Sequence, residues 1–410
     1  MVLNYIWFAF FAIAFVVALI KVIFFGDLEV FTNMVNATFD MSKTAVNLSI
    51  SLLGGMCLWL GLMKIGEKSG LVNILTKLVG PFFSRLFPEI PKNHRATGSI
   101  IMNFSANILG LDNAATPIGL KAMNEMQELN PNKDTASNAQ IMFLVLNTSG
   151  LSIIPLTILI DRSAQGAANP TDIFLPILLA TFCSTIVGLI TVSIFQKINL
   201  LDRVILSYLL GLTTIIGLLI FYLTTLSQAE MNQFSSFLSN FIIFGMIISF
   251  LFLGFRKKID LFSTFIEGAK EGFSITLKIV PFLIAFLVGI GVFRASGAFD
   301  YLIDLLRLIV GLTGINADFV DALPVALMKP LSGGTARSMM LEIIDVHGVD
   351  SFVDKLASTL RGATETTFYI VAVYFGSVNI KNVRYAITAG LIADLAGIIA
   401  AIVFGYMFFH

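Results

Sequence analysis

Long apolar runs are the feature that most constrains the fold of this 410-residue chain. Each run holds roughly the 20 residues that an α-helix needs to cross about 30 Å of hydrocarbon. Apolar residues make up 57% of the chain and charged residues 13%, whereas an ordinary soluble domain is about 25% charged. The sequence therefore predicts an all-α, polytopic membrane protein. Its expected spans lie near residues 2–25, 44–66, 171–196, 203–226, 234–255, 273–293 and 385–408.

Several function classes are disfavoured by what the polar minority lacks. The 26 basic and 26 acidic residues cancel, so no basic footprint for a nucleic acid is expected. The three histidines fit no metal-ligand spacing, and the sequence contains no nucleotide-binding motif, so neither a metal nor a cofactor is predicted. There is also no paired set of catalytic aspartates and no Ser/His dyad, which argues against an intramembrane enzyme.

Two stretches, 97–161 and 317–379, are apolar but interrupted by polar clusters, glycines and prolines. Irregular backbone at membrane depth is tolerated only where it is buried in protein or lines a watery cavity. We therefore expect broken or re-entrant helices in both stretches. Such breaks are the first candidates for a functional site.

Amphipathic segments accompany the long runs. The segments 69–87 and 297–312 each follow a Ser-Gly pair, and the segments 28–43 and 259–272 each precede a long run and mix charges with Phe. All four are interpreted as helices that lie in the headgroup plane.

The order of these elements occurs twice. The cluster 102–107 takes the same place in the first half as 328–333 takes in the second, and 147–150 corresponds to 362–365. Three regions are therefore predicted, namely a first repeat, a joining transmembrane helix and a second repeat, over residues 1–197, 198–229 and 230–410.

Lysine and arginine fall on opposite ends of equivalent elements in the two halves. The basic segment 64–95 should be cytoplasmic, but its counterpart 294–316 has balanced charges, and the basic loop 256–258 lies one span earlier. The simplest interpretation is two repeats of inverted topology, an arrangement common in secondary transporters.

The first pair of polar clusters predicts two helix breaks. Residues 103–107 lead into Gly-Leu-Asp-Asn, after which Thr116-Pro117 should begin a helix that reaches about Met126. In the second half, a helix should begin at Ala336. A break exposes free N–H groups and a positive dipole end to a bound solute, although a kink satisfied within the protein is the alternative. The candidate solute-binding residues here are Asn103, Ser105, Asn107, Asn113, Lys329, Ser332, Gly333, Gly334 and Thr335.

The second pair of clusters precedes two apolar segments in the broken stretches. Hydroxyl, amide and carboxylate groups at this depth need partners, and interhelical hydrogen bonding is the alternative to a solute-lining role. The further candidates for solute binding are Asn147, Thr148, Ser149, Thr364, Glu365 and Thr366.

Isolated charges form the third group. Lys329, Arg337 and Arg361 flank the breaks of the second half, and either Lys329 or Arg337 could pair with Glu365. Asp394 shares a helix face with Gly390 and Gly397, so it should face protein, where a hydrogen bond to a neighbouring break is the favoured interpretation. The candidates for coupling to a proton or cation are Asp112, Glu365 and Asp394.

The motifs at these positions are similar to two known families. Residues 1–197 resemble the spore maturation protein A family through LGLMKIGEKSGL (60–71) and NILGLDNAATPIGLKAM (107–123). Residues from about 230 to 410 resemble the spore maturation protein B family through KPLSGGTA (329–336) and GATETTFYIVAVYFGSVNIK (362–381). The chain resembles a fusion of the two.

Both families belong to a wider nucleoside-recognition, or Gate, group, which the membrane part of the bacterial ferrous iron transporter and some nucleoside and small-carboxylate carriers share. The resemblance implies membrane transport or gating without fixing the substrate. The iron branch is disfavoured because no G-domain motif is present and neither break carries Cys.

We therefore expect a multi-pass protein of the cytoplasmic (inner) membrane that moves a small polar solute, either nucleoside-like or carboxylate-like, through a site at the interface of the two repeats. The expected partners are this solute and the lipid bilayer, and the chain is also a candidate homo-oligomer. The alternative function is a non-transporting sensor, or a scaffold for a partner protein, which the absence of a soluble signalling domain in the sequence makes weaker.

Overall fold

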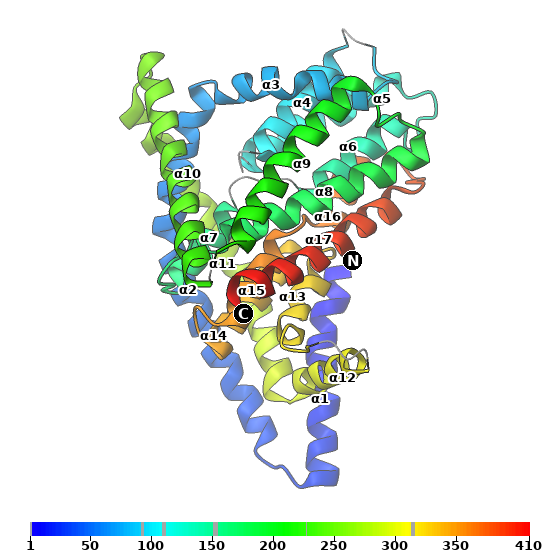
Figure 1. The fold of residues 1–410 in the computed structure, drawn as a ribbon. Coiled ribbons are helices and arrows are strands. Elements are labelled where there is room, and N and C mark those ends of the chain that lie inside the picture. The colour runs from blue at the N-terminus through cyan, green and yellow to red at the C-terminus, as the bar shows by residue number, and fades with distance from the viewer. Residues whose placement is uncertain (1, 92–93, 109–111, 151–154, 227, 313–315) are drawn as a thin grey trace. The chain divides into compact units, whose positions relative to one another are not determined.

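The computed structural model describes residues 2–91, 94–108, 112–150, 155–226, 228–312 and 316–410. These residues form seventeen α-helices and one short 3₁₀ helix and contain no β-strand (Figure 1). One isolated parallel bridge joins Thr135 to Asn382. The predicted all-α class is therefore confirmed.

Five helices in the described part of the chain are long and apolar enough to cross a membrane, and each coincides with a predicted span. They are α1 (Val2–Phe25), α8 (Phe174–Gln196), α9 (Arg203–Thr224), α10 (Gln228–Arg256) and α17 (Ala386–Phe409). The two remaining predicted spans, 44–66 and 273–293, lie inside the longer helices α2 (Val30–Lys68) and α11 (Leu261–Ala295).

The separate interfacial helices predicted over 28–43 and 259–272 are wrong, because α2 and α11 run through these segments without a break. No glycine or proline occurs between residues 30 and 53, so nothing in that stretch stops a helix. The first proline of α11 is Pro281, which lies well inside the helix.

The two amphipathic segments that follow a Ser-Gly pair are helices, α3 (Leu71–Leu86) and α12 (Ala298–Gly311). Both begin after a glycine in the left-handed region, with φ of 77° at Gly70 and 84° at Gly297, which favours glycine over other residues. The serine before each glycine donates to the carbonyl three residues earlier, at 2.7 Å in both cases. The repeated pair thus makes the same turn in both halves.

The chain divides into two compact units, and each contains residues of both predicted halves. Unit 1 comprises residues 1–60, 157–170 and 269–361, and unit 2 comprises 61–156, 171–268 and 362–410.

Two broken segments account for this mixing. In the first half, α6 (Asn138–Ser149) belongs to unit 2, whereas α7 (Leu156–Ala164) belongs almost entirely to unit 1. In the second half, α15 (Phe352–Gly362) belongs to unit 1 and α16 (Thr367–Ser377) to unit 2. The second helix of each broken segment, α7 or α16, therefore belongs to a different unit from the first. We call α7 and α16 the exchanged helices.

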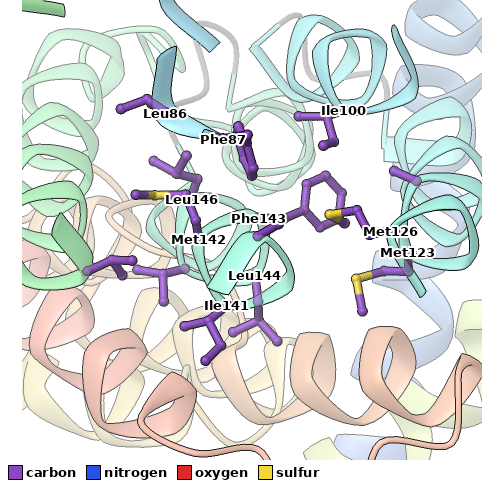
Figure 2. Close-up of a cluster of buried hydrophobic side chains, with 14 of the residues drawn as sticks. Leu86, Phe87, Ile100, Met123, Met126, Ile141, Met142, Phe143, Leu144 and Leu146 are labelled. Atoms are coloured by element: carbon purple, nitrogen blue, oxygen red, sulfur yellow. The ribbon is translucent and has the colours of Figure 1, made fainter. Parts of the chain in front are cut away.

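Unit 2 is organised around α6. In this helix every residue from Ala139 to Ser149 is buried, and a helix that is apolar on all sides is suited to a core position. The helices α8, α16, α17, α4 (Arg95–Ile108) and α5 (Asp112–Leu129) contact it. Figure 2 shows its apolar side chains between Leu86, Phe87 and Ile100 on one side and Met123 and Met126 on another.

Each unit also contains two successive helices separated by a break, which we call its broken pair. In unit 2 the broken pair is α4 and α5, and in unit 1 it is α13 (Leu323–Met328) and α14 (Gly333–His347). These two helices pack against each other and against the 3₁₀ helix η1 (Val320–Ala322), which also contacts α12. The indole of Trp7 on α1 donates to the carbonyl of Ala285 on α11 at 2.9 Å, which fastens the first helix to this unit.

The helix starts at both breaks differ from the predictions. In the first half, α5 begins at Asp112 rather than at Thr116, so Pro117 is its sixth residue and lacks the N–H that would donate a helical hydrogen bond. In the second half, α14 begins at Gly333 rather than at Ala336, because Ser332 accepts the Thr335 N–H at 3.2 Å and caps the helix.

Candidate functional site

Four polar side chains in unit 2 form a cluster that we call the amide junction: Asn103, Asn107, Asn147 and Tyr374. The Asn107 amide donates to the Asn147 amide oxygen at 2.8 Å and to that of Asn103 at 3.3 Å. The Tyr374 hydroxyl donates to the same Asn147 oxygen at 3.4 Å and accepts from the Asn103 amide at 3.5 Å. The Asn103 and Asn147 amides also donate to the backbone carbonyls of Ala115 and Phe143, both at 2.8 Å. All the donors and acceptors of the junction are neutral.

Local helix geometry places these groups together. Asn103 and Asn107 are four residues apart near the end of α4 and therefore share one face. Asn147 lies in the last turn of α6 and Tyr374 lies on α16. A Cβ at position 119 would overlap the Tyr374 hydroxyl, so the glycine there permits α16 to approach α5. The sequence analysis missed Tyr374, which lies in an apolar segment.

Other predicted site residues beside this junction are placed in three ways. Ser105 is fully buried on α4. The hydroxyls of Thr148 and Ser149 donate to carbonyls of their own helix, at 2.9 and 3.1 Å, which is common for such residues inside helices. The side chains of Asp112 and Asn113 lie outside the described part of the structure.

The second polar clusters of the two halves meet in unit 2. The backbone N–H of Glu365 donates to the carbonyl of Thr148 at 2.8 Å, and the Glu365 side chain, which is exposed, lies against Gly150. Thr364 is buried, and the buried Thr366 is the N-cap residue of α16. Segments that the sequence places about 215 residues apart are therefore adjacent.

Asp394 lies on the apolar span α17 and faces protein, as predicted. Its carboxylate accepts a hydrogen bond from the Thr367 hydroxyl at 2.7 Å, and Thr367 is the first residue of α16, directly after the break at 363–366. Gly390 and Gly397 allow the side chains of Thr367 and Thr364 to approach α17 closely. The predicted hydrogen bond to a neighbouring break is thus present in the structure.

A second cluster, in unit 1, consists of charged side chains, and we call it the arginine junction: Asp161, Arg337 and Arg361. The Arg337 Nε donates to both Asp161 carboxylate oxygens at 2.9 and 3.0 Å, and its Nη2 donates to Oδ1 at 2.5 Å. The Arg361 Nη1 donates to Asp161 Oδ2 at 2.7 Å. Asp161 is completely buried, and each arginine is 8% exposed.

This arrangement corrects the suggested pairing of Arg337 with Glu365. Its partner is Asp161 on α7, 176 residues earlier in the chain. The adjacent Arg162, also completely buried, binds Asp354 at 2.8 Å and Asp350 at 2.7 Å. The sequence analysis missed this Asp-Arg pair, although two adjacent charges directly after the run LTILI were a usable signal.

The remaining predicted residues surround the start of α14 in unit 1. Ser332 receives hydrogen bonds from the Thr335 N–H at 3.2 Å and from the Thr335 hydroxyl at 2.9 Å. Gly333 and Gly334 form the first two helical positions, and Lys329, which is 8% exposed, follows α13 directly. These groups present a positive helix end and a cation at the same break.

The two junctions are built in the same way. In unit 2, Tyr374 of the exchanged helix α16 contacts Asn103 of the broken pair and Asn147 in the last turn of α6. In unit 1, Asp161 of the exchanged helix α7 contacts Arg337 of the broken pair and Arg361 in the last turn of α15. One unit makes this three-way contact from neutral groups and the other from charges.

Comparisons with known proteins agree with these features. The model of the family described as Gate, nucleoside recognition, matches residues 49–160 and 276–381, one segment in each predicted half. Spore maturation protein A of Bacillus subtilis is 47% identical over 154 residues, which is 38% of this chain and 79% of that protein. Spore maturation protein B of the same organism is 44% identical over 158 residues, 38% of this chain and 87% of that protein. These matches are consistent with a fusion of two such proteins. No solved structure matches the chain.

Proposed function

Because the chain belongs to the Gate family of nucleoside-recognition proteins, we propose that it carries a small polar solute across the membrane. In this proposal the helix breaks of two inverted repeats provide the polar groups along the path, and the protein resides in the cytoplasmic (inner) membrane. The observation that carries the proposal is the amide junction, which gathers three amides and a phenol at the ends of α4 and α6.

The position of this junction at the ends of broken helices supports a role in solute binding. Buried polar groups are costly unless they are hydrogen-bonded, so a solute that enters the junction must replace the bonds that it breaks. Broken helices whose ends face a solute recur in secondary transporters. The junction includes Asn147 of α6, a helix that is buried from Ala139 to Ser149, so its groups are available only to a solute small enough to enter a packed helical unit.

The chemistry of the junction supports a neutral, nucleoside-like part of the solute. An amide side chain offers two donors and one acceptor oxygen, and a phenol both donates and accepts. A partner that presents donors and acceptors along one edge, as a nucleobase does, can replace the internal bonds between Asn107, Asn147 and Tyr374. A fixed charge would gain less from these neutral groups.

Reconstitution of the full-length protein into liposomes tests the proposal. Uptake should be measured for a panel of radiolabelled nucleosides, dicarboxylates and amino acids, against liposomes without protein. We expect at least one solute to accumulate, and we expect Asn103→Ala to lower its uptake about tenfold, as the loss of one buried hydrogen bond to the solute would.

The matched control is Asn124→Ala, because Asn124 is an exposed asparagine on α5 whose amide only donates to the Leu120 carbonyl of its own helix. This variant should transport like the wild type. Folded, correctly inserted protein that accumulates no solute of the panel would contradict the proposal and favour the alternative of a sensor or scaffold.

A further inference from the structure

Arg337 is bound by protein along only one side of its guanidinium. All of its hydrogen bonds with described residues go to Asp161, through Nε and Nη2. In the part of the chain that the structure describes, no acceptor bonds its Nη1. The residue is nevertheless only 8% exposed.

A guanidinium held in this way is prepared for an anion. Its five N–H donors form a rigid planar fork that matches a carboxylate in a bidentate geometry. Asp161 fixes the plane through Nε and Nη2, and the opposite end of the fork is left for a second acceptor. Because the plane is fixed in advance, little side-chain entropy would be lost on binding.

The neighbouring Arg162 provides an internal comparison. Arg162 donates to two carboxylates, those of Asp350 and Asp354. These carboxylates also accept hydrogen bonds from the backbone N–H groups of Ala168 and Asp350 and from the hydroxyl of Ser358. Around Asp161 the ratio of carboxylates to guanidiniums is reversed, because two guanidiniums share one carboxylate. Protein thus gives Arg162 two carboxylates, whereas the Asp161 cluster gives Arg337 a single one.

The surroundings of Arg337 also favour negative charge. Arg337 lies in the second turn of α14, whose N-terminus carries the positive end of the helix dipole. The buried Lys329 belongs to the same break, three residues before the Ser332 cap. The positive end of the helix dipole raises the local affinity for an anion beside Arg337.

We propose that the Nη end of Arg337 binds a carboxylate group of the transported solute, with Asp161 as the positioning residue that orients the guanidinium. This inference rests on the proposed function, because it names the chemical class of the solute. It assigns carboxylate recognition to the arginine junction of unit 1.

Direct binding to the purified full-length protein in detergent tests the inference without relying on transport. The probes are acetate, lactate, succinate and glutamate, each compared by titration calorimetry with its neutral amide: acetamide, lactamide, succinamide and glutamine. We expect at least one acid to bind and its amide to bind about 10-fold to 100-fold more weakly, the range for hydrogen bonds to a charged group.

The variant Arg337→Lys keeps the positive charge but loses the fork, so it should weaken binding of that acid by a similar factor. The matched control is Arg307→Lys, because Arg307 is a half-exposed arginine of unit 1 that pairs with Asp321; this variant should bind like the wild type. If Arg337→Lys does not fold, Arg337→Gln removes the fork, leaves the pair of Asp161 and Arg361 intact, and should fold without distinguishing acid from amide.

Two results would overturn the inference. One is that no acid binds more tightly than its amide, and the other is that Arg337→Lys binds the acid as tightly as the wild type. Uptake of uridine by the same preparation separates the two claims: uptake without acid binding removes the carboxylate assignment but leaves the proposed transport function intact. Acid binding that depends on Arg337, with no uptake of any solute, would support the assignment and contradict transport.

Discussion

The amide junction of unit 2 and the arginine junction of unit 1 occupy equivalent places and use different chemistry. In each, a side chain of an exchanged helix contacts one residue of a broken helix pair and one residue in the last turn of the preceding helix. The neutral set can exchange its bonds with a polar solute at small cost. Removal of one charge from the charged set is costly, because it leaves the buried partners uncompensated. A similar three-way contact is therefore made by neutral groups in one unit and by charged groups in the other.

The largest effect is expected from Asp161→Asn. This change leaves Arg337 and Arg361 buried without a carboxylate, and breaking a buried ion pair costs about 3–5 kcal/mol. The free energy of unfolding in detergent, measured by denaturant titration, should fall by about that amount. Asp321→Asn, which removes the partner of the half-exposed Arg307, should cost about 1 kcal/mol or less. Equal losses for the two variants would show that burial of the arginine junction has no special weight.

A smaller effect is expected where the exchanged helix α16 is bound to α17. Thr367→Val keeps the shape of the side chain but removes the hydroxyl that donates to Asp394 at 2.7 Å. Loss of a buried hydrogen bond of this kind should lower the free energy of unfolding by about 1–3 kcal/mol. The matched control is Thr225→Val, because the exposed hydroxyl of Thr225 only donates to a carbonyl of its own helix. A control that costs as much as Thr367→Val would refute the assigned role of this bond.

In the amide junction, Tyr374→Phe should have a still smaller effect. Its hydroxyl makes two long hydrogen bonds, of 3.4 and 3.5 Å, so we expect a loss of about 1 kcal/mol. Together with Asp161→Asn, this variant measures the difference between the neutral and the charged junction. A loss as large as that of Asp161→Asn would remove the distinction between them.

The smallest effect is expected for an exposed ion pair outside both junctions. Lys68 and Glu267 lie 2.5 Å apart, with about half of each side chain exposed. The hydrogen bond from Lys68 lowers the pKa of Glu267, so any stabilisation is present at neutral pH and disappears as the pH falls through that lowered pKa. Exposed pairs contribute little, and the melting temperature of Glu267→Gln should match that of the wild type at pH 7. A clear drop would mean that charge, rather than burial, explains the arginine junction.

Most of the local structure could be predicted from the sequence because it depends on local patterns. The apolar runs at 2–25 and 385–408 correspond to α1 and α17, and the Ser-Gly pairs mark the starts of α3 and α12. The polar clusters at 147–150 and 329–335 mark real interruptions between helices. The errors are at boundaries, as at Thr116-Pro117, where a cap-like dipeptide lies within the first two turns of α5.

The long-range pairing could not be predicted, because no local pattern specifies it. Arg337 lies close in sequence to Glu365, yet its partner is Asp161 on a helix of the other half. In the sequence, Tyr374 is one aromatic residue among many in apolar segments, and its role depends on the packing of α16 against α5 and α6. The exchange of α7 and α16 between the units creates both junctions, and it is a property of topology rather than of any motif.

Polar side chains at the helix breaks are proposed to bind the transported solute. The most direct test is uptake into proteoliposomes of the solute selected from the panel, by the wild type and by a variant with Asn147→Ala, Lys329→Ala and Glu365→Ala combined. Gel filtration and the melting temperature in detergent should establish that the variant is folded. We expect the uptake by the triple variant to fall by at least about tenfold. Wild-type uptake by the folded variant would show that these side chains do not bind the solute.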